Sequence, residues 1–195
     1  KPVDLDAALA CAASEGTVAD AVTTATATIG EKISLRRIAV VEKADDEFFG
    51  CYMHMGGKIS ALVTLKGKAD EAVAKNIAMQ IASMAPQYVN RDEMPAEVVE
   101  HERKVQTEIV KNDEKLANKP EKVLAGIIEG KISKNLKDLC LVEQEFFLDP
   151  NMKVAQYLKE NGCDVVSFVR YAVGEGIEKR QDNFAEEVMS QAFGG

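Results

Sequence analysis

Side chains that could do chemistry are few in this chain and lie far apart in the sequence. The 195 residues include two histidines and four cysteines, and neither histidine stands at ligand spacing from a cysteine. The cysteines form no Cys-x-x-Cys pair, which argues against a zinc site and favours reduced, mostly buried thiols; they are Cys11, Cys51, Cys140 and Cys163. No nucleophile with a base and no acid–base pair can be assembled. We therefore expect neither an enzyme nor a bound metal or cofactor.

A pair of glycines, Gly174 and Gly176, superficially resembles a phosphate-binding loop. The pair lacks a third glycine and the Lys-Ser/Thr that follows it in such loops. Glu175 and Glu178 would also repel a phosphate group. We interpret the glycines instead as a turn between the end of a strand and a short, charged, amphipathic helix at residues 177–188.

Composition narrows the class of protein further. The net charge of −8 argues against direct nucleic-acid binding, because neutralising phosphates requires clustered Lys and Arg. No window approaches 18 uncharged apolar residues and no secretory signal is present, so we expect a cytoplasmic protein without a membrane span. The chain begins at Lys1 rather than Met, which suggests a longer native N-terminus.

The first half of the chain predicts a helix, three strands and a second helix. Residues 17–29 place apolar side chains at helical spacing before a glycine, and residues 32–42 are rich in β-formers. Two alternating runs, residues 48–54 and 58–66, flank Met-Gly-Gly and predict a hairpin. Residues 68–85 then form a strong amphipathic pattern.

The second half begins with a change of character. From Pro95 a thin apolar seam runs through long charged stretches on both sides of Pro120, which predicts two helices in an antiparallel coiled-coil hairpin. A helix from residue 154 to about 162 and a strand at 164–173 follow. The fold class is therefore α+β, with small antiparallel sheets of three-stranded type packed against helices.

Two parts of the sequence resemble each other. Ser, Arg, Ala, Val and Glu coincide when residues 33–42 are aligned with residues 166–175, and a helix precedes each strand. We infer two related subdomains. The second is complete and is interrupted by the helical hairpin, whereas the first keeps only its last helix and strand. The strand at 32–42 would then lack neighbours, so we expect self-association through its exposed edge or through the hairpin, or disorder there.

These observations give domain boundaries. Residues 1–45 are the remnant of the first subdomain, and residues 46–90 with 140–176 form the second. Residues 91–139 are the inserted hairpin, and residues 177–195 are a C-terminal helical module.

Several motifs in this order resemble the elongation factor Ts family, from about residue 17 onward. The motifs are Ile29-Gly-Glu-Lys-Ile33, Leu35-Arg-Arg37, Tyr52-Met-His-Met-Gly-Gly-Lys-Ile59, Asn76-Ile-Ala-Met-Gln-Ile-Ala-Ser83, Pro86-Gln-Tyr88, Lys119-Pro-Glu-Lys122, Glu129-Gly-Lys131, Cys140-Leu-Val-Glu-Gln144 and Arg170–Val188. The resemblance implies a guanine nucleotide exchange factor of translation elongation. Such a factor binds elongation factor Tu and releases GDP by disrupting its phosphate and magnesium site.

The resemblance also implies partner-binding positions. Ile29 and Gly30 match the Ile-Gly turn of the family, and His54 matches the histidine of its Tyr-x-His-x-Gly-Gly turn. Taken alone, these would be an ordinary helix end and an ordinary turn residue. The family's Gln-Pro-Phe-Val contact segment corresponds to residues 144–147, where Glu145 and Phe147 replace Pro and Val. The C-terminal helix adds a partner-binding region with Ile177, Phe184 and Val188.

Two parts of the family pattern are absent from this chain. They are the small N-terminal helical domain and the Thr-Asp-Phe motif, so we expect weak exchange even where binding is retained. Lys58 and Ser60 also stand where Arg and Gly are more usual. The alternative hypothesis is a non-catalytic interaction or dimerisation module that uses the coiled-coil hairpin.

Overall fold

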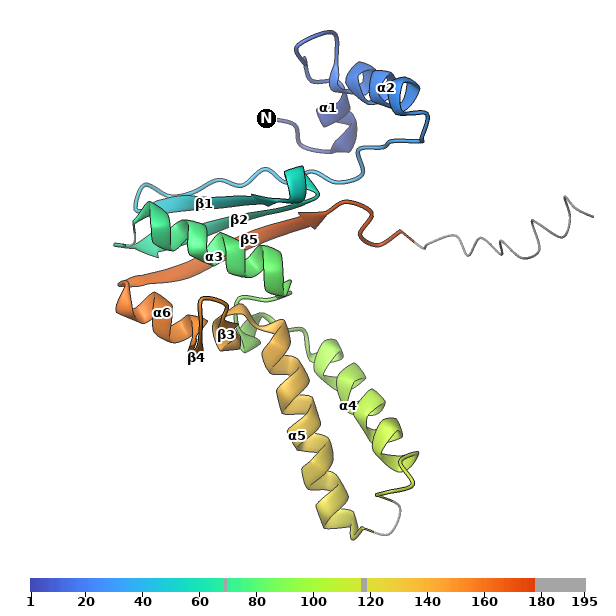
Figure 1. Ribbon diagram of the computed structural model, residues 1–195, viewed down its shortest axis with the longest axis vertical. Coiled ribbons are helices and arrows are strands. Elements are labelled where there is room, and N and C mark those ends of the chain that lie inside the picture. The colour runs from blue at the N-terminus through green and yellow to red at the C-terminus, as the bar shows by residue number, and fades with distance from the viewer. Residues whose placement is uncertain (69, 117–118, 178–195) are drawn as a thin grey trace, which may run out of the picture.

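The computed structural model describes residues 1–68, 70–116 and 119–177, and its centre is a three-stranded antiparallel sheet (Figure 1). The strands are β1 (Glu47–His54), β2 (Ile59–Gly67) and β5 (Cys163–Ala172), in the order β1-β2-β5. Ala61, Val63 and Leu65 alternate along β2 and are buried on one face. The predicted hairpin and the predicted last strand are therefore confirmed, within a residue or two at each end.

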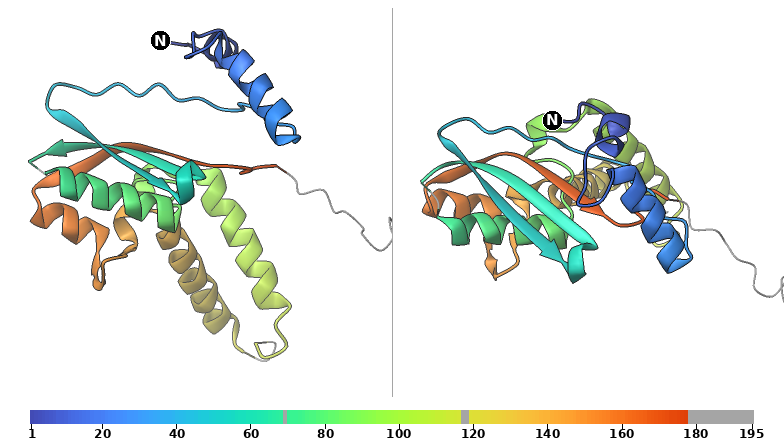
Figure 2. Two further views of the ribbon diagram at one scale, coloured as in Figure 1. Left: turned by 45° about the horizontal axis from the view of Figure 1, so that its top comes forward. Right: turned by 90° about the horizontal axis from the view of Figure 1, so that it is seen from above.

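Helices cover one face of this sheet. α3 (Glu71–Met84) and α6 (Val154–Glu160) lie on the same side (Figure 2). α3 begins where the Asp70 side chain accepts a 2.9 Å hydrogen bond from the Val73 amide. Its buried stripe includes Val73, Ile77 and Ile81, spaced as the apolar periodicity predicts. Both helices agree with the sequence prediction.

A close approach between β1 and α3 explains one glycine. A Cβ atom built on Gly50 would lie 2.7 Å from the carbonyl carbon of Ala74. Only glycine permits this distance between strand and helix. The packing of α3 on β1 therefore depends on this position.

Two helices within residues 91–139 extend away from the sheet. α4 (Ala96–Lys111) and α5 (Glu121–Leu139) run in opposite directions side by side (Figure 1). They begin directly after Pro95 and Pro120. Arg103 pairs with Glu129 across them, and the Asn135 amide donates a 2.6 Å hydrogen bond to Glu102. A separate apolar cluster at their base contains Met94, Ile132, Leu136 and Cys140.

A small corner joins α5 to α6, and the sequence did not predict it. β3 (Glu145–Phe146) and β4 (Asp149–Lys153) pair as a two-stranded antiparallel sheet. Pro150 lies within β4. Strands this short carry too few residues for a recognisable alternation.

The N-terminal part contains two helices. α1 (Leu5–Leu9) was not predicted, whereas α2 (Val18–Ile29) agrees with the predicted helix at residues 17–29. α2 begins with a capping box in which Thr17 and Asp20 bond reciprocally to each other's backbone amides. It ends at Gly30, whose φ of 78° lies in the left-handed region.

The predicted strand at residues 32–42 is wrong. Residues 31–46 form an extended segment, here called the strap, which crosses the sheet on the face opposite α3 (Figure 2). Strand pairing requires a neighbour within the plane of the sheet, but the strap meets the side chains on its face. No backbone-to-backbone hydrogen bond joins residues 34–43 to another described residue. The segment predicted to be the remnant of the first subdomain therefore contains α1, α2 and the strap, without a sheet of its own among the described residues.

Candidate functional site

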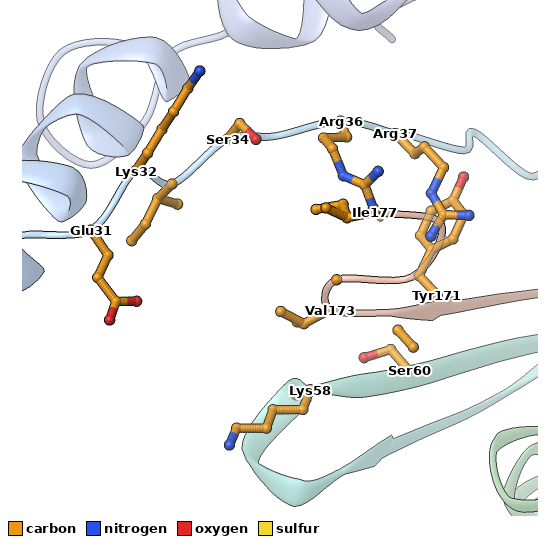
Figure 3. A pocket seen from close by; sticks show the side chains of 14 residues that line it. Glu31, Lys32, Ser34, Arg36, Arg37, Lys58, Ser60, Tyr171, Val173 and Ile177 are labelled. Carbon is orange, nitrogen blue, oxygen red and sulfur yellow. The ribbon is translucent and has the colours of Figure 1, made fainter. Parts of the chain in front are cut away.

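Three segments that are distant in sequence surround one hollow at the end of the sheet (Figure 3). Its volume is about 480 Å³. The start of the strap forms one wall, the β1–β2 turn the second, and the end of β5 with the following turn the third. The lining includes Glu31, Lys32, Ser34, Arg36, Arg37, Gly57, Lys58, Ser60, Tyr171, Val173 and Ile177. Three groups of predicted partner-binding residues belong to these walls or adjoin them.

Ile29 and Gly30 precede the first wall directly. Gly30 ends α2 and no atom lies within 4 Å of a Cβ built on it, so backbone conformation rather than crowding favours glycine there. Ile29 is 60% exposed in the last turn of α2. A large apolar side chain is therefore presented to solvent where the strap begins.

His54 ends β1 at the second wall. Its Nδ1 atom lies 3.1 Å from the hydroxyl of Tyr52, and both side chains face solvent at least in part. Met55, Gly56 and Gly57 then have φ values of 51°, 67° and 91°, a left-handed run that reverses the chain tightly. Met53 and Met55 flank His54 and are strongly exposed. Two large apolar side chains therefore face solvent beside the β1–β2 turn.

Ile177 lies at the third wall and lines the hollow itself. Its side chain is 55% exposed, and that of Val173, four residues earlier, is 79% exposed. Sequence reasoning missed Val173, although it occupies the end of the predicted last strand. The other two predicted residues of the C-terminal helix, Phe184 and Val188, lie outside the described residues.

Phe147 does not belong to this hollow. It follows β3 on the helix side of the sheet, where its amide donates a 2.8 Å hydrogen bond to the side chain of Gln80. Its ring packs edge-on against Phe146, with 5.4 Å between centroids. Ile177 thus lines the hollow, Ile29, Gly30 and His54 lie within three residues of its lining residues Glu31 and Gly57, and Phe147 lies between β3 and β4.

The charges of the hollow are organised around Glu175. One carboxylate oxygen of Glu175 accepts a 2.8 Å bond from Arg37 and the other a 3.1 Å bond from Arg170. The hydrogen bond from Arg37 is the main reason that the pKa of Glu175 lies below its ordinary value. Arg37 also stacks over the ring of Tyr171, with its Cζ atom 4.6 Å from the centroid. The sequence analysis identified Leu35-Arg-Arg37 as a family motif but predicted no partner for Arg37.

Several exposed apolar side chains lie near the hollow in sequence. No cluster of three or more His, Cys, Asp or Glu residues in the described part of the chain could hold a metal ion. None of the helices described is long and apolar enough to cross a membrane. The residues that line the hollow or lie close to its lining in sequence include the exposed apolar side chains of Ile29, Met53, Met55, Val173 and Ile177. Exposed apolar side chains gathered beside charged ones are typical of protein-binding surfaces.

A comparison with known protein families gives one match. The model of the family described as "Elongation factor TS" matches residues 1–175. The match covers the helical hairpin, the strap and the residues that line the hollow, except Ile177.

Proposed function

The chain belongs to the elongation factor Ts family, and from that premise we propose that it binds elongation factor Tu·GDP and promotes GDP release. The hollow supports this proposal most directly, because its lining, which includes the exposed Ile177, comes from three segments that are separated in sequence. Ile29 and His54, both predicted to contact the partner, lie within three residues of lining residues. A composite surface of this kind suits a folded protein partner.

The exchange requires no reacting group on this chain. A protein accelerates GDP release when it binds the nucleotide-free partner more tightly than the nucleotide-bound partner, and this coupling is reciprocal. Each tenfold weakening of GDP binding takes about 1.4 kcal/mol of that difference. We propose that side chains packed against the loops that hold phosphate and magnesium supply it. Apolar contacts from exposed Ile and Met side chains are suitable, because their burial is favourable only in the complex.

The release of a fluorescent GDP analogue from elongation factor Tu tests the proposal. We expect substoichiometric amounts of the chain to accelerate release, because one molecule can act on many partners. Acceleration should disappear when the chain is heat-denatured. Unchanged release at a concentration that saturates binding would reject exchange and leave binding alone.

A second candidate function is an interaction or dimerisation module. The observation in its favour is that α4 and α5 extend away from the sheet and carry exposed apolar residues, Ile109 on α4 and Val123 on α5. The unpaired backbone of the strap is another candidate for contact between copies. Sedimentation across a range of concentrations tests this function: a constant monomer mass would reject self-association.

A further inference from the structure

We propose that Glu175 is a positioning residue that assembles the partner-binding surface by tying the strap to the end of β5. The proposal rests on the proposed function for its consequence, whereas the tie itself is visible in the structure. Glu175 lies between the two glycines of the turn that follows β5. Its carboxylate accepts from Arg37 of the strap at 2.8 Å and from Arg170 of β5 at 3.1 Å. Its backbone carbonyl accepts a third bond, from Arg36.

The two arginines that bind the carboxylate of Glu175 make further contacts with different elements. Arg170 also donates a 3.2 Å hydrogen bond to the carbonyl of Ala82 in α3 and is the most buried of the three side chains in the two ion pairs. Arg37 lies on the ring of Tyr171. Glu175 therefore joins a fixed guanidinium on the sheet to a guanidinium on a segment that has no strand pairing.

The β1–β2 turn, which forms the second wall of the hollow, is held by a backbone hydrogen bond. The amide of Val173 donates a 2.8 Å hydrogen bond to the carbonyl of Lys58, which ties the end of β5 to the β1–β2 turn. Backbone bonds thus hold the His54 turn and the Ile177 segment together. Ile29 and Gly30 directly precede the strap, whose residues 31–43 make no backbone-to-backbone hydrogen bond to another described residue, so Glu175 supplies this connection.

The strength expected of the ion pair between Arg37 and Glu175 suits a positioning role. The side chains of Arg37 and Glu175 are 42% and 40% exposed, so water and salt screen their attraction. Removing such a contact changes an equilibrium by about three- to fivefold, which is too little to unfold the sheet. Loss of Glu175 should therefore release the strap and leave the core intact.

Trypsin measures this release without any partner. It must take Arg36 or Arg37 into its binding pocket, and both guanidinium groups are bound to Glu175 in the closed strap. We expect Glu175→Gln to raise cleavage at these two sites about three- to fivefold relative to cleavage after Lys115 in the α4–α5 loop. The matched control is Glu129→Gln, which breaks the exposed Arg103–Glu129 pair of the hairpin. Cleavage rates equal to wild type in Glu175→Gln would overturn the proposal.

Binding to nucleotide-free elongation factor Tu measures the consequence. We expect Glu175→Gln and Arg37→Ala each to weaken affinity about three- to fivefold at low salt, with the thermal midpoint nearly unchanged. The double variant should be no weaker than either single variant, and the difference from wild type should shrink in 0.5 M NaCl. If the loss of binding free energy in the double variant equals the sum of the losses in the two single variants, the proposal is overturned. If the wild-type chain does not bind elongation factor Tu, the proposed function fails. A positioning role of Glu175 toward this partner then fails as well. The trypsin experiment still decides whether Glu175 holds the strap in place.

Discussion

The fully buried side chain of Gln80 in α3 donates a 3.0 Å hydrogen bond to the side-chain oxygen of Gln144, which follows α5. Gln80 also donates to the carbonyl of Glu145 and accepts from the amide of Phe147. Gln144 in turn donates a 2.7 Å bond to the carbonyl of Asp138 near the end of α5. Two amide groups therefore connect the sheet and its helix to the base of the helical hairpin. Such buried networks specify one arrangement because each member is satisfied only there.

Replacement of Gln80 by Leu should destabilise the fold by about 2–3 kcal/mol, since buried polar groups would lose their partners. The groups affected are the Phe147 amide and the side-chain oxygen of Gln144. Urea unfolding followed by circular dichroism measures the change. Gln156→Leu is the control, because Gln156 is exposed on α6 and bonds only to Glu160 among the described residues. A loss below about 0.5 kcal/mol for Gln80→Leu would contradict this account.

Two glycine substitutions should have opposite effects on stability. Gly50→Ala places a methyl group against the backbone of Ala74 and should cost about 1–3 kcal/mol. Gly126→Ala, within α5, meets no atom within 4 Å and should stabilise by about 0.5–1 kcal/mol because alanine is the better helix former. Thermal unfolding of both variants measures the pair. Equal thermal midpoints for Gly50→Ala and wild type would show that α3 shifts away from β1 to accommodate the methyl group without a loss of stability.

Local sequence signals predicted the regular elements well. α3 could be predicted because Val73, Ile77 and Ile81 recur at helical spacing, and the β1–β2 hairpin because alternation flanks a glycine turn. The course of the strap could not be predicted in this way. Its Ile, Leu and Val residues fit a strand, but pairing depends on a neighbouring backbone that no local pattern reveals.

In the candidate site, too, local motifs could be recognised in the sequence, whereas long-range contacts could not. The family resemblance pointed to Ile29, Gly30, His54 and Ile177, of which Ile177 lines the hollow. The contact between Arg37 and Glu175 spans 138 positions in the sequence and depends on the strap crossing the sheet. The exposure of Met53 could not be predicted either, since the face of a strand that turns to solvent follows from tertiary packing.

Acid should weaken the joint between the hairpin and the sheet. Arg91 holds Glu143 through two bonds, one of 2.9 Å, and this hydrogen bonding is the first reason that the pKa of Glu143 lies below its ordinary value of 4.5. A lowered folded-state pKa contributes stability above the unfolded-state pKa and loses it as the pH falls through the folded-state value. Wild type should therefore exceed Glu143→Gln in stability at pH 7, and this difference should shrink steadily below about pH 4.3. Urea unfolding from pH 7 to pH 3 measures it; a difference independent of pH would contradict the assignment.

Ile177→Ala should reduce binding to elongation factor Tu without reducing stability. The side chain is more than half exposed in the free chain, so its truncation should change the free energy of unfolding by less than about 0.5 kcal/mol. A central apolar contact in the complex is worth about 1–2 kcal/mol, which corresponds to a loss of affinity of about five- to thirtyfold. Ile109→Ala is the matched control, because Ile109 is similarly exposed but lies on α4, away from the hollow. Calorimetric titration of both variants against nucleotide-free partner separates them. Equal affinities would place the contact surface elsewhere, and a loss confined to Ile109→Ala would move it to the helical hairpin.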